Sequence, residues 1–564
     1  MMSSIPPLVE VPRRVIGRRR AFADGLLDVL GLAVVATAVV YLYASSSRAW
    51  TTIGGTKTRL LALEVPLFWV VTWLAHVPLA GLRPALARLR GWLLAVMPPL
   101  VLYVLVDGFF GWLHRAPRLT DLRNFTTLLG ASPMLALGVS SMLAGVFVVP
   151  AVRLGLLARA TSARTLACWC IPRLAVIVLL AVGLSSPSPL RSYVLTTMEN
   201  GSWSERWSLR HGGRLASVAY LHARRAVAIE GLAELGQPAA QDRRFASPVT
   251  ERRNLHLVVL ESFVDPRLFE GVAFDSSPLH PRLARLLGGA DPALDQITTP
   301  VYGGGTAQTE FELLTGLPAL GRVESIEFNA LDGDAVPSLV HGLRAQGYRT
   351  VATIATSSQF YNSLRAYRSL GFELAHFHDG ASYLGDGERG ILFDGELLQK
   401  NLEFVSAHYI ERGEPVFNYV LGMYGHHPYW RDRSARPDVC RLVGGDGSST
   451  IERVANQFWY RTGALADFLV ALRERDPTAI VLVTSDHLPP LVDGAIRYRH
   501  ELDCNICLCF VGTERLRWSQ QPTFHVPYVL WERLSGQPIA VPDAHELERY
   551  YLATLAAGLG LSAK

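Results

Sequence analysis

Four side chains that could bind a metal ion or attack phosphorus stand directly after apolar runs or a glycine turn. Glu261 follows one apolar run, Asp486 and His487 follow another, and Thr306 follows three consecutive glycines. Taken singly, each has an ordinary use as a strand-end acid, a cap or a turn residue. Together, two carboxylates, one imidazole and one hydroxyl suit a divalent cation such as Mn²⁺, Mg²⁺ or Zn²⁺. The four residues therefore predict a metal site.

The segment around Thr306 predicts the start of a short helix. After Gly303-Gly-Gly-Thr306, the apolar residues Phe311, Leu313 and Leu314 stand among helix-forming neighbours. Glycines let a backbone approach a phosphate closely, and the free N–H groups of a helix N-terminus favour anions. Taken alone, a Thr at this position is most often an N-cap. A cation on its hydroxyl would instead lower the pKa of that group and make it a nucleophile.

From Asn254 onward, short β runs alternate with amphipathic helices, which predicts an α/β domain of about 300 residues. The best strands are continuously apolar, as expected for strands buried on both faces of a mostly parallel sheet. They are Leu255–Leu260, Thr350–Ile354, Val416–Leu421 and Ile480–Val483. Ligands bind outside the carboxyl ends of such strands, so we expect the four candidate residues to meet in one crevice.

The first third of the chain contains five apolar stretches, each near the roughly 20 residues needed to cross a bilayer. They are Leu26–Tyr43, Leu60–Leu82, Trp92–Leu113, Pro133–Leu156 and Leu166–Leu184. Arginines are concentrated before the first stretch and in the second and fourth connections, which places the N-terminus in the cytoplasm. Five crossings then put the residues after Ser185 outside. We expect the first stretch to be a retained span and not a cleaved signal peptide.

We therefore expect three parts: a five-helix transmembrane domain (1–185), a partly helical connector (186–253) and an extracytoplasmic α/β catalytic domain (254–564). The Arg-rich stretch Leu209–Leu235 fits either a solvated helix or one that lies on anionic headgroups. The formal net charge of +5 is mild and comes mostly from the cytoplasmic arginines, so it does not favour nucleic-acid binding.

The six cysteines predict no redox or zinc centre. Cys504 and Cys507 have CxxC spacing, but they run into an apolar strand without the βαβ context of a redox motif. Core thiols, or one disulfide in an oxidising compartment, are the expected states.

Four segments of the sequence resemble the lipoteichoic acid synthase family, membrane-bound phosphoglycerol transferases of the alkaline phosphatase/sulfatase superfamily. They are residues 260–263 (LESF), 303–312 (GGGTAQTEFE), 425–429 (GHHPY) and 485–489 (SDHLP). The resemblance extends to the layout of five spans and an outer catalytic domain. It implies that Glu261, Thr306, Asp486 and His487 form the metal site and that Thr306 is the nucleophile.

The same resemblance implies substrate-binding residues. His426 would contact the substrate phosphate or glycerol, and Tyr361 stands where the family has an aromatic residue beside the substrate. Two positions after that aromatic residue the family usually has an Arg, whereas this chain has Ser363. Arg365 is close enough in sequence to substitute for it. This departure concerns the identity of the headgroup more than the metal chemistry.

The implied reaction is a two-step transfer in the cell (inner) membrane, with the catalytic domain of a multi-pass protein on the extracytoplasmic or periplasmic side. Thr306 would attack phosphatidylglycerol or a related phospholipid and release diacylglycerol. The phosphoglycerol would then pass to an envelope glycan or a glycerol-phosphate polymer. The expected cofactor is one divalent ion, Mn²⁺ first, with Mg²⁺ and Zn²⁺ as alternatives.

Three other functions are alternatives to this transfer. A sulfatase-like hydrolase or phosphodiesterase would use water as acceptor, but true sulfatases need a C/S-x-P-x-R run where this chain has Thr306-Ala-Gln-Thr-Glu. Phosphoethanolamine transferases share the fold but lack the GGGTAxTEFE run. A non-catalytic membrane protein is disfavoured because all four candidate metal ligands are intact.

Overall fold

The structure is a computed structural model with two compact units. The first holds most residues up to Ala226, and the second holds Val227–Lys564 together with the short segments Trp112–His114 and Thr120–Thr127. It describes residues 30–40, 60–76, 84–113, 116–124, 162–199, 212–234 and 243–561, together with Leu209 and scattered residues between 140 and 159. Within the last range it leaves out 334–335, 359, 379–382, 385–390, 445–448, 492–496, 500 and 502.

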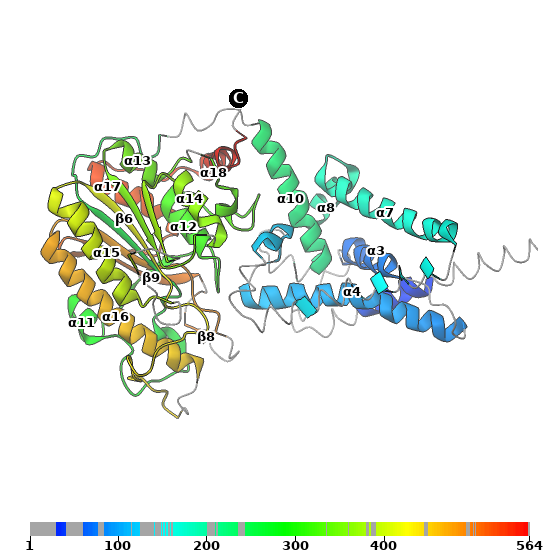
Figure 1. Ribbon diagram of the computed structural model, residues 1–564, viewed down its shortest axis with the longest axis horizontal. Coiled ribbons are helices and arrows are strands. Elements are labelled where there is room, and N and C mark those ends of the chain that lie inside the picture. Colours follow the sequence, from blue (N-terminus) through cyan, green and yellow to red (C-terminus); the bar gives the residue numbers. More distant parts are fainter. Residues whose placement is uncertain are drawn as a thin grey trace, which may run out of the picture. The chain divides into compact units, whose positions relative to one another are not determined.

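The first unit is helical (Figure 1). Its named elements are the π-helix η2 (Leu60–Glu64), α3 (Val65–Ala75), α4 (Pro84–Leu113), α7 (Ala163–Ser185), α8 (Pro189–Glu199) and the start of α10 (Arg214–Glu234). Two described helices, Gly91–Phe110 and Ala163–Ser185, are long and apolar enough to cross a membrane, and Leu30–Val40 and Ala62–Ala75 are shorter apolar helices. The expected set of five spans is therefore not confirmed. The fourth stretch, Pro133–Leu156, lies mostly outside the described residues.

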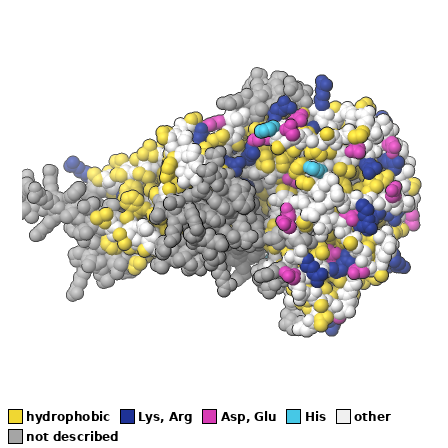
Figure 2. Space-filling view, turned by 180° about the vertical axis from the view of Figure 1, so that it is seen from behind, with side chains coloured by type: hydrophobic (Ala, Val, Ile, Leu, Met, Phe, Trp, Pro, Cys, Tyr) yellow, Lys and Arg dark blue, Asp and Glu magenta, His cyan; other side chains and the backbone are white. Residues whose placement is uncertain are grey.

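Helix α7 carries an arginine whose charge is accommodated within the first unit. The Arg173 guanidinium lies over the rings of Trp169 and Trp73, 3.8 and 4.5 Å from their centroids. It donates to the carbonyl oxygens of Trp169 and His76 at 2.9 and 3.2 Å. These partners accommodate the charge of Arg173, and α7 runs on through Pro172 and Arg173. On the face shown in Figure 2, hydrophobic side chains gather over this unit, whereas charged side chains are spread over the second.

The second unit is built on an eight-stranded sheet in the order β10-β9-β7-β1-β6-β4-β5, with β3 beside β9. Strands β7, β1, β6, β4 and β5 are parallel, and β9 is antiparallel to β7. The strands are β1 (Leu255–Leu260), β3 (Asp295–Thr298), β4 (Arg349–Ile354), β5 (Leu374–Phe377), β6 (Val416–Gly422), β7 (Ile480–Ser485), β9 (Cys504–Val511) and β10 (Glu514–Leu516); β2 (Phe269–Glu270) and β8 (Arg497–Tyr498) form a separate pair. All four predicted strands and the mostly parallel α/β architecture are confirmed.

Helices cover both faces of this sheet (Figure 1). On one face α15 (Asp394–His408) packs against α16 (Thr450–Arg475), with α11 (Pro281–Leu286) beside them. On the other, α12 (Thr306–Thr315) packs against α13 (Leu339–Ala345) and α17 (Val526–Ser535). The remaining elements are α14 (Ser363–Ser369), α18 (Ala544–Gly558) and the 3₁₀ turns η3 (Leu119–Asn124), η5 (Pro266–Leu268), η6 (Glu327–Ala330), η7 (Phe360–Asn362), η8 (Ile410–Arg412) and η9 (Thr523–His525).

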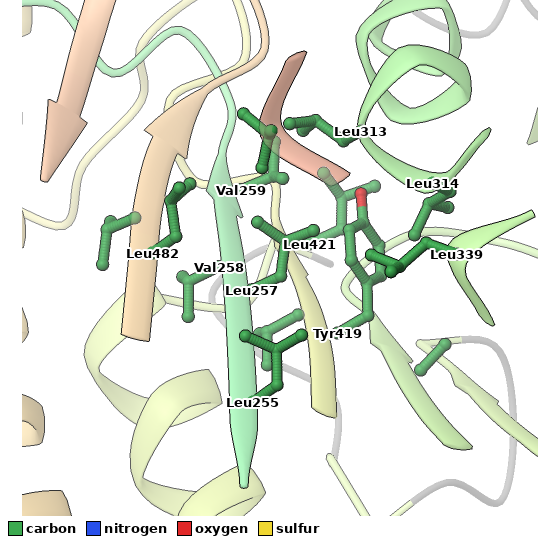
Figure 3. Packing of buried hydrophobic residues seen from close by; sticks show 14 of the residues in the cluster. Leu255, Leu257, Val258, Val259, Leu313, Leu314, Leu339, Tyr419, Leu421 and Leu482 are labelled. Carbon is green, nitrogen blue, oxygen red and sulfur yellow. The ribbon is translucent and has the colours of Figure 1, made fainter. Parts of the chain in front are cut away.

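The core holds α12 firmly on the sheet. Leu313 and Leu314 of α12 belong to the same buried cluster as Leu257, Tyr419 and Leu421 of the central strands (Figure 3). These apolar residues were the signal for the predicted helix after Thr306, and that helix is confirmed. Its burial fixes the N-terminus of α12 relative to the sheet.

All six cysteines lie among the described residues and carry free thiols. The four in the second unit are buried: Cys440, Cys504, Cys507 and Cys509. The alternative of a disulfide is therefore wrong, and the expectation of core thiols is confirmed.

Candidate active site

Two adjacent parallel strands end in the acidic and imidazole groups of the candidate site. Leu260, the last residue of β1, pairs with Ser485, the last residue of β7. Glu261 follows the first strand, and Asp486 and His487 follow the second. One ligand atom from each of these three buried residues lies within 4.8 Å of the other two. The structure thus brings together the three groups as the strand ends led us to expect.

Thr306 completes this cluster from the helix side. Residues 303–305 have φ angles of 73°, 151° and 88°, which only glycine adopts without strain. The N-cap of α12 is Gly305, and Thr306 is the first helical residue. Its hydroxyl donates to Glu261 Oε2 at 3.1 Å. The alternative that Thr306 is an N-cap is therefore wrong, and its oxygen lies beside a candidate metal ligand.

The donor atoms of the cluster fit a cation. His487 Nδ1 donates to the Leu488 carbonyl oxygen at 3.0 Å, so in its neutral form the imidazole turns a lone pair on Nε2 toward the carboxylates. That nitrogen lies 3.1 Å from Asp486 Oδ2 and 3.3 Å from Glu261 Oε1. Asp486 Oδ2 is buried and accepts no hydrogen bond from the described part of the chain. Three electron-rich atoms so close together require a positive charge or a shared proton between them.

The pKa values of the cluster residues also favour a bound cation. Burial and the charge of Glu261 raise the pKa of Asp486 to about 8. Burial opposes protonation of His487, but Asp486 and Glu261 raise its pKa above the ordinary value. Burial also acts to raise the pKa of Glu261, yet the charges of His487 and His426 hold it at about 2. Without a cation the cluster retains protons near neutral pH, and a divalent ion would displace them.

His426 lies in the loop after β6, the strand on the other side of β1. Its imidazole is half-buried, and Nδ1 faces the His427 carbonyl oxygen at 2.7 Å. The preceding residue, Gly425, packs against the metal-ligand segment, since a Cβ there would lie 1.9 Å from the Glu261 carbonyl oxygen, so the His426 loop passes close to Glu261. This position is compatible with the substrate contact that the sequence predicts.

Tyr361 and Arg365 belong to the segment around the start of α14. Tyr361 is half-buried with a φ of 47°, a left-handed conformation that is uncommon for a non-glycine residue. The Ser363 hydroxyl donates to the Phe360 carbonyl. Arg365 has 64% of its side chain exposed and pairs with Asp332 at 2.7 Å. The substrate-binding roles of Tyr361 and Arg365 stay predictions.

Two hydroxyl residues that the sequence analysis did not single out also hold the cluster. Ser262 donates its N–H to Asp486 Oδ1 at 2.8 Å and its hydroxyl to Glu261 Oε1 at 2.9 Å. Thr309 donates to the main-chain oxygen of Asp486 at 2.6 Å. Both stand inside the quoted motifs, and Thr309 lies about one helical turn after Thr306, which was the available signal.

The two acids of the TEFE segment have structural partners instead of a place in the cluster. Glu310 accepts hydrogen bonds from the hydroxyls of Tyr367 and Tyr419. Glu312 accepts one from the Thr523 hydroxyl. Burial raises the pKa of each carboxyl group to about 7. The acids therefore lock α12 to neighbouring elements.

Replacing Glu310 with Gln is expected to flatten the pH dependence of stability. Between 4.5, the ordinary pKa of Glu, and about 7, the folded chain keeps a proton that the unfolded chain has released. The free energy of unfolding should therefore fall as the pH rises through this window, by about 3 kcal/mol. Gln cannot ionise, so the variant should not lose this contribution. As the pH rises from 4.5 to about 7, the Tm of the variant should therefore increase relative to the Tm of the wild type. A difference that does not change with pH would contradict this assignment.

Comparison with known proteins assigns the later part of the chain to a family. The family model described as Sulfatase matches residues 253–549. A Rhizobium meliloti protein, named as a candidate cyclic beta-1,2-glucan modification protein, is 30% identical over 249 residues, 43% of this chain and 37% of its own length. The chain thus spans little more than a third of that relative.

Two solved structures are similar to part of this chain. The lipoteichoic acid synthase LtaP from Listeria monocytogenes has a TM-score of 0.42 and 16% identity, over 55% of this chain and 77% of its own. The Streptococcus pyogenes phosphoglycerol transferase GacH, solved with sn-glycerol-1-phosphate, has the same TM-score and identity. The match covers 59% of this chain and 92% of GacH.

Proposed function

This chain belongs to the sulfatase family, and we propose that it is a metal-dependent transferase that moves a phosphoglycerol group from a phospholipid to an envelope glycan or polymer. One observation carries the proposal: a threonine hydroxyl at a helix N-terminus, hydrogen-bonded to Glu261 within a buried Glu–Asp–His cluster. A hydroxyl held among carboxylate and imidazole ligands suits nucleophilic attack on phosphorus.

The nucleophile position favours phosphorus over sulfur chemistry within this family. True sulfatases use a formylglycine, which forms from Cys or Ser in a C/S-x-P-x-R run. Residues 306–310 of this chain read TAQTE instead. Thr306 keeps an ordinary secondary hydroxyl, which forms a phosphodiester when it attacks a phospholipid.

In the proposed first step, Thr306 Oγ attacks the phosphorus of phosphatidylglycerol. Thr306 releases its hydroxyl proton, the bond from phosphorus to the diacylglycerol oxygen breaks, and that oxygen takes up a proton. In the second step an acceptor hydroxyl loses its proton as it attacks the same phosphorus, the bond to Thr306 breaks, and Thr306 Oγ takes a proton back. A divalent ion held by Glu261, Asp486, His487 and Thr306, Mn²⁺ in our proposal, would supply the charge that ionises the threonine hydroxyl.

The chain's own residues would orient the reactants. The hydrogen bond to Glu261 Oε2 fixes the rotamer of Thr306, and the N-terminus of α12 offers free N–H groups for the phosphate oxygens. His426, on the neighbouring loop, would contact the phosphate or the glycerol and supply the proton for the leaving oxygen.

The rest of the chain and one relative support the proposed donor and acceptor. Two helices long enough to cross a membrane support a multi-pass position in the inner membrane, with the catalytic domain outside, where a lipid donor is available. The Rhizobium relative's name supports a glycan acceptor. Phosphoethanolamine transfer and hydrolysis are the alternatives on the same cluster.

A trapping experiment tests this proposal. The full chain in detergent is mixed with phosphatidylglycerol in the absence of an acceptor, and the reaction is quenched in acid. The protein is then digested, and the mass of the Thr306 peptide is measured by mass spectrometry. We expect a phosphoglycerol adduct on Thr306. A phosphoethanolamine adduct formed only from phosphatidylethanolamine would assign the alternative headgroup, and release of free glycerol phosphate with no adduct would favour hydrolysis.

Arg365→Ala tests whether Arg365 replaces the family's arginine. If it binds the substrate phosphate, kcat/KM for phosphatidylglycerol should fall roughly 10- to 100-fold, the scale of one charge-assisted hydrogen bond. Metal affinity should not change. Asp332→Ala is the matched control, because it removes the ion-pair partner of Arg365 and leaves the guanidinium in place. Equal kcat/KM in wild type and Arg365→Ala would remove Arg365 from the substrate site.

A further inference from the structure

One face of α16 carries three side chains that donate to main-chain carbonyls around the candidate site. They are Arg453, Gln457 and Arg461, spaced four residues apart and therefore on the same side of the helix. Arg453 donates to the Pro428 carbonyl oxygen at 3.1 Å. The other two, which are more buried, reach the elements that carry His426 and Glu261.

Gln457 closes the loop that carries His426. Its Nε2 atom donates to the Tyr424 carbonyl oxygen at 2.9 Å and to the Trp430 carbonyl oxygen at 2.8 Å. The side chain is 2% exposed, and both amide hydrogens are used. One amide group therefore ties the two ends of the loop together on either side of His426.

Arg461 holds the main chain of the metal ligand itself. Its Nη2 donates to the Glu261 carbonyl oxygen at 2.8 Å, and its Nε donates to Asp394 Oδ2 at 2.6 Å. The guanidinium and the carboxylate are 3% and 0% exposed, so each neutralises the other's buried charge. Arg461 is thus fixed from α15 on one side and directed at Glu261 on the other.

The two attachments meet at Gly425. A Cβ at this position would lie 1.9 Å from the Glu261 carbonyl oxygen and 2.5 Å from Arg461 Nη1. Only glycine lets the His426 loop pack this closely on the metal ligand and on the guanidinium. The loop and Glu261 therefore share one support.

We propose that Gln457 and Arg461 are positioning residues, which together set the place of His426 relative to the metal ligand Glu261. The inference rests on the proposed function only for what His426 does there. A buried amide and a buried ion pair add little to stability compared with apolar residues of the same volume. Their donors are directed at main-chain oxygens of the site, where geometry matters most.

The test compares full-length Gln457→Met and Arg461→Lys with wild type. Met keeps the volume of Gln but donates nothing; Lys keeps the charge but lacks the fork that reaches two acceptors. For Gln457→Met we expect kcat/KM to fall roughly 10-fold with Mn²⁺ affinity unchanged. For Arg461→Lys we expect Mn²⁺ affinity itself to fall roughly 10-fold, with activity recovering at excess Mn²⁺.

Arg473→Lys is the matched control, because this arginine of the same helix lies over Phe510, away from the site loops. Hydrogen exchange of residues 424–430 gives a readout that needs no activity, and we expect it to speed up in Gln457→Met alone. If Gln457→Met does not fold, the shorter Gln457→Asn replaces it. The inference would be overturned if the loop in Gln457→Met exchanged at the wild-type rate and Arg461→Lys bound Mn²⁺ with wild-type affinity. Absence of transfer by the wild type would reject the proposed function but leave these two measurements valid.

Discussion

Thr306→Ala is expected to abolish transfer while the chain remains folded. The hydroxyl is the proposed nucleophile, and loss of a covalent nucleophile costs roughly 10³-fold or more in rate. Its structural role is small, because its hydrogen bond to Glu261 contributes about 1 kcal/mol. The measurements are diacylglycerol release from phosphatidylglycerol and thermal unfolding of the same preparation.

Thr315→Ala provides the control, since it removes the same atoms from the other end of α12. The Thr315 hydroxyl is also buried, but its contacts are local, since it donates to the Phe311 carbonyl oxygen and accepts from the Leu317 N–H. This variant should lose a comparable amount of stability and keep its turnover. Turnover by a folded Thr306→Ala protein within tenfold of the control would rule out the covalent mechanism.

Removal of the metal should have an effect of similar size. Without a cation Asp486 keeps a proton near neutral pH, because burial and the charge of Glu261 raise its pKa to about 8, and in the proposed mechanism the ion lowers the pKa of Thr306. Chelation should therefore eliminate activity, and added Mn²⁺ or Mg²⁺ should restore it. Because the ion displaces protons, its apparent affinity should rise with pH up to about 8.

Asp486→Asn and His487→Ala locate the ion. Each should weaken Mn²⁺ binding by roughly 10- to 100-fold or more, measured by titration of the stripped protein. Glu312→Gln is the control, since Glu312 is a buried acid of α12 that binds Thr523 and not the cluster. Full turnover by the stripped wild type would show that the cluster has another role.

The part of the fold nearest the site was predictable because it rests on local patterns. Continuous apolar runs located β1, β4, β6 and β7, and the residue after a parallel strand always lies at the same sheet edge. Glycines before Thr306 and apolar residues after it indicated the helix that presents the hydroxyl. The resemblance to the superfamily, read from four short motifs, is confirmed by the family match over residues 253–549.

The supports of the site were not predictable in the same way. Gln457 and Arg461 bind carbonyl oxygens 33 and 200 residues away. Every residue has a main-chain carbonyl, so the residue types of the acceptors do not indicate these contacts. The Ser262 contacts depend on a left-handed backbone conformation with a φ of 48°, which a serine does not predict. In the first unit, apolar length alone indicated five spans, of which two described helices reach the required length.

The buried thiols of the second unit bear on how this domain is made. Burial raises the pKa of Cys507 and Cys509, so the reactive thiolate form is suppressed in the folded chain. With all six sulfurs unpaired, folding requires neither an oxidant nor a disulfide isomerase. The native state is therefore the reduced one for all four thiols of this domain.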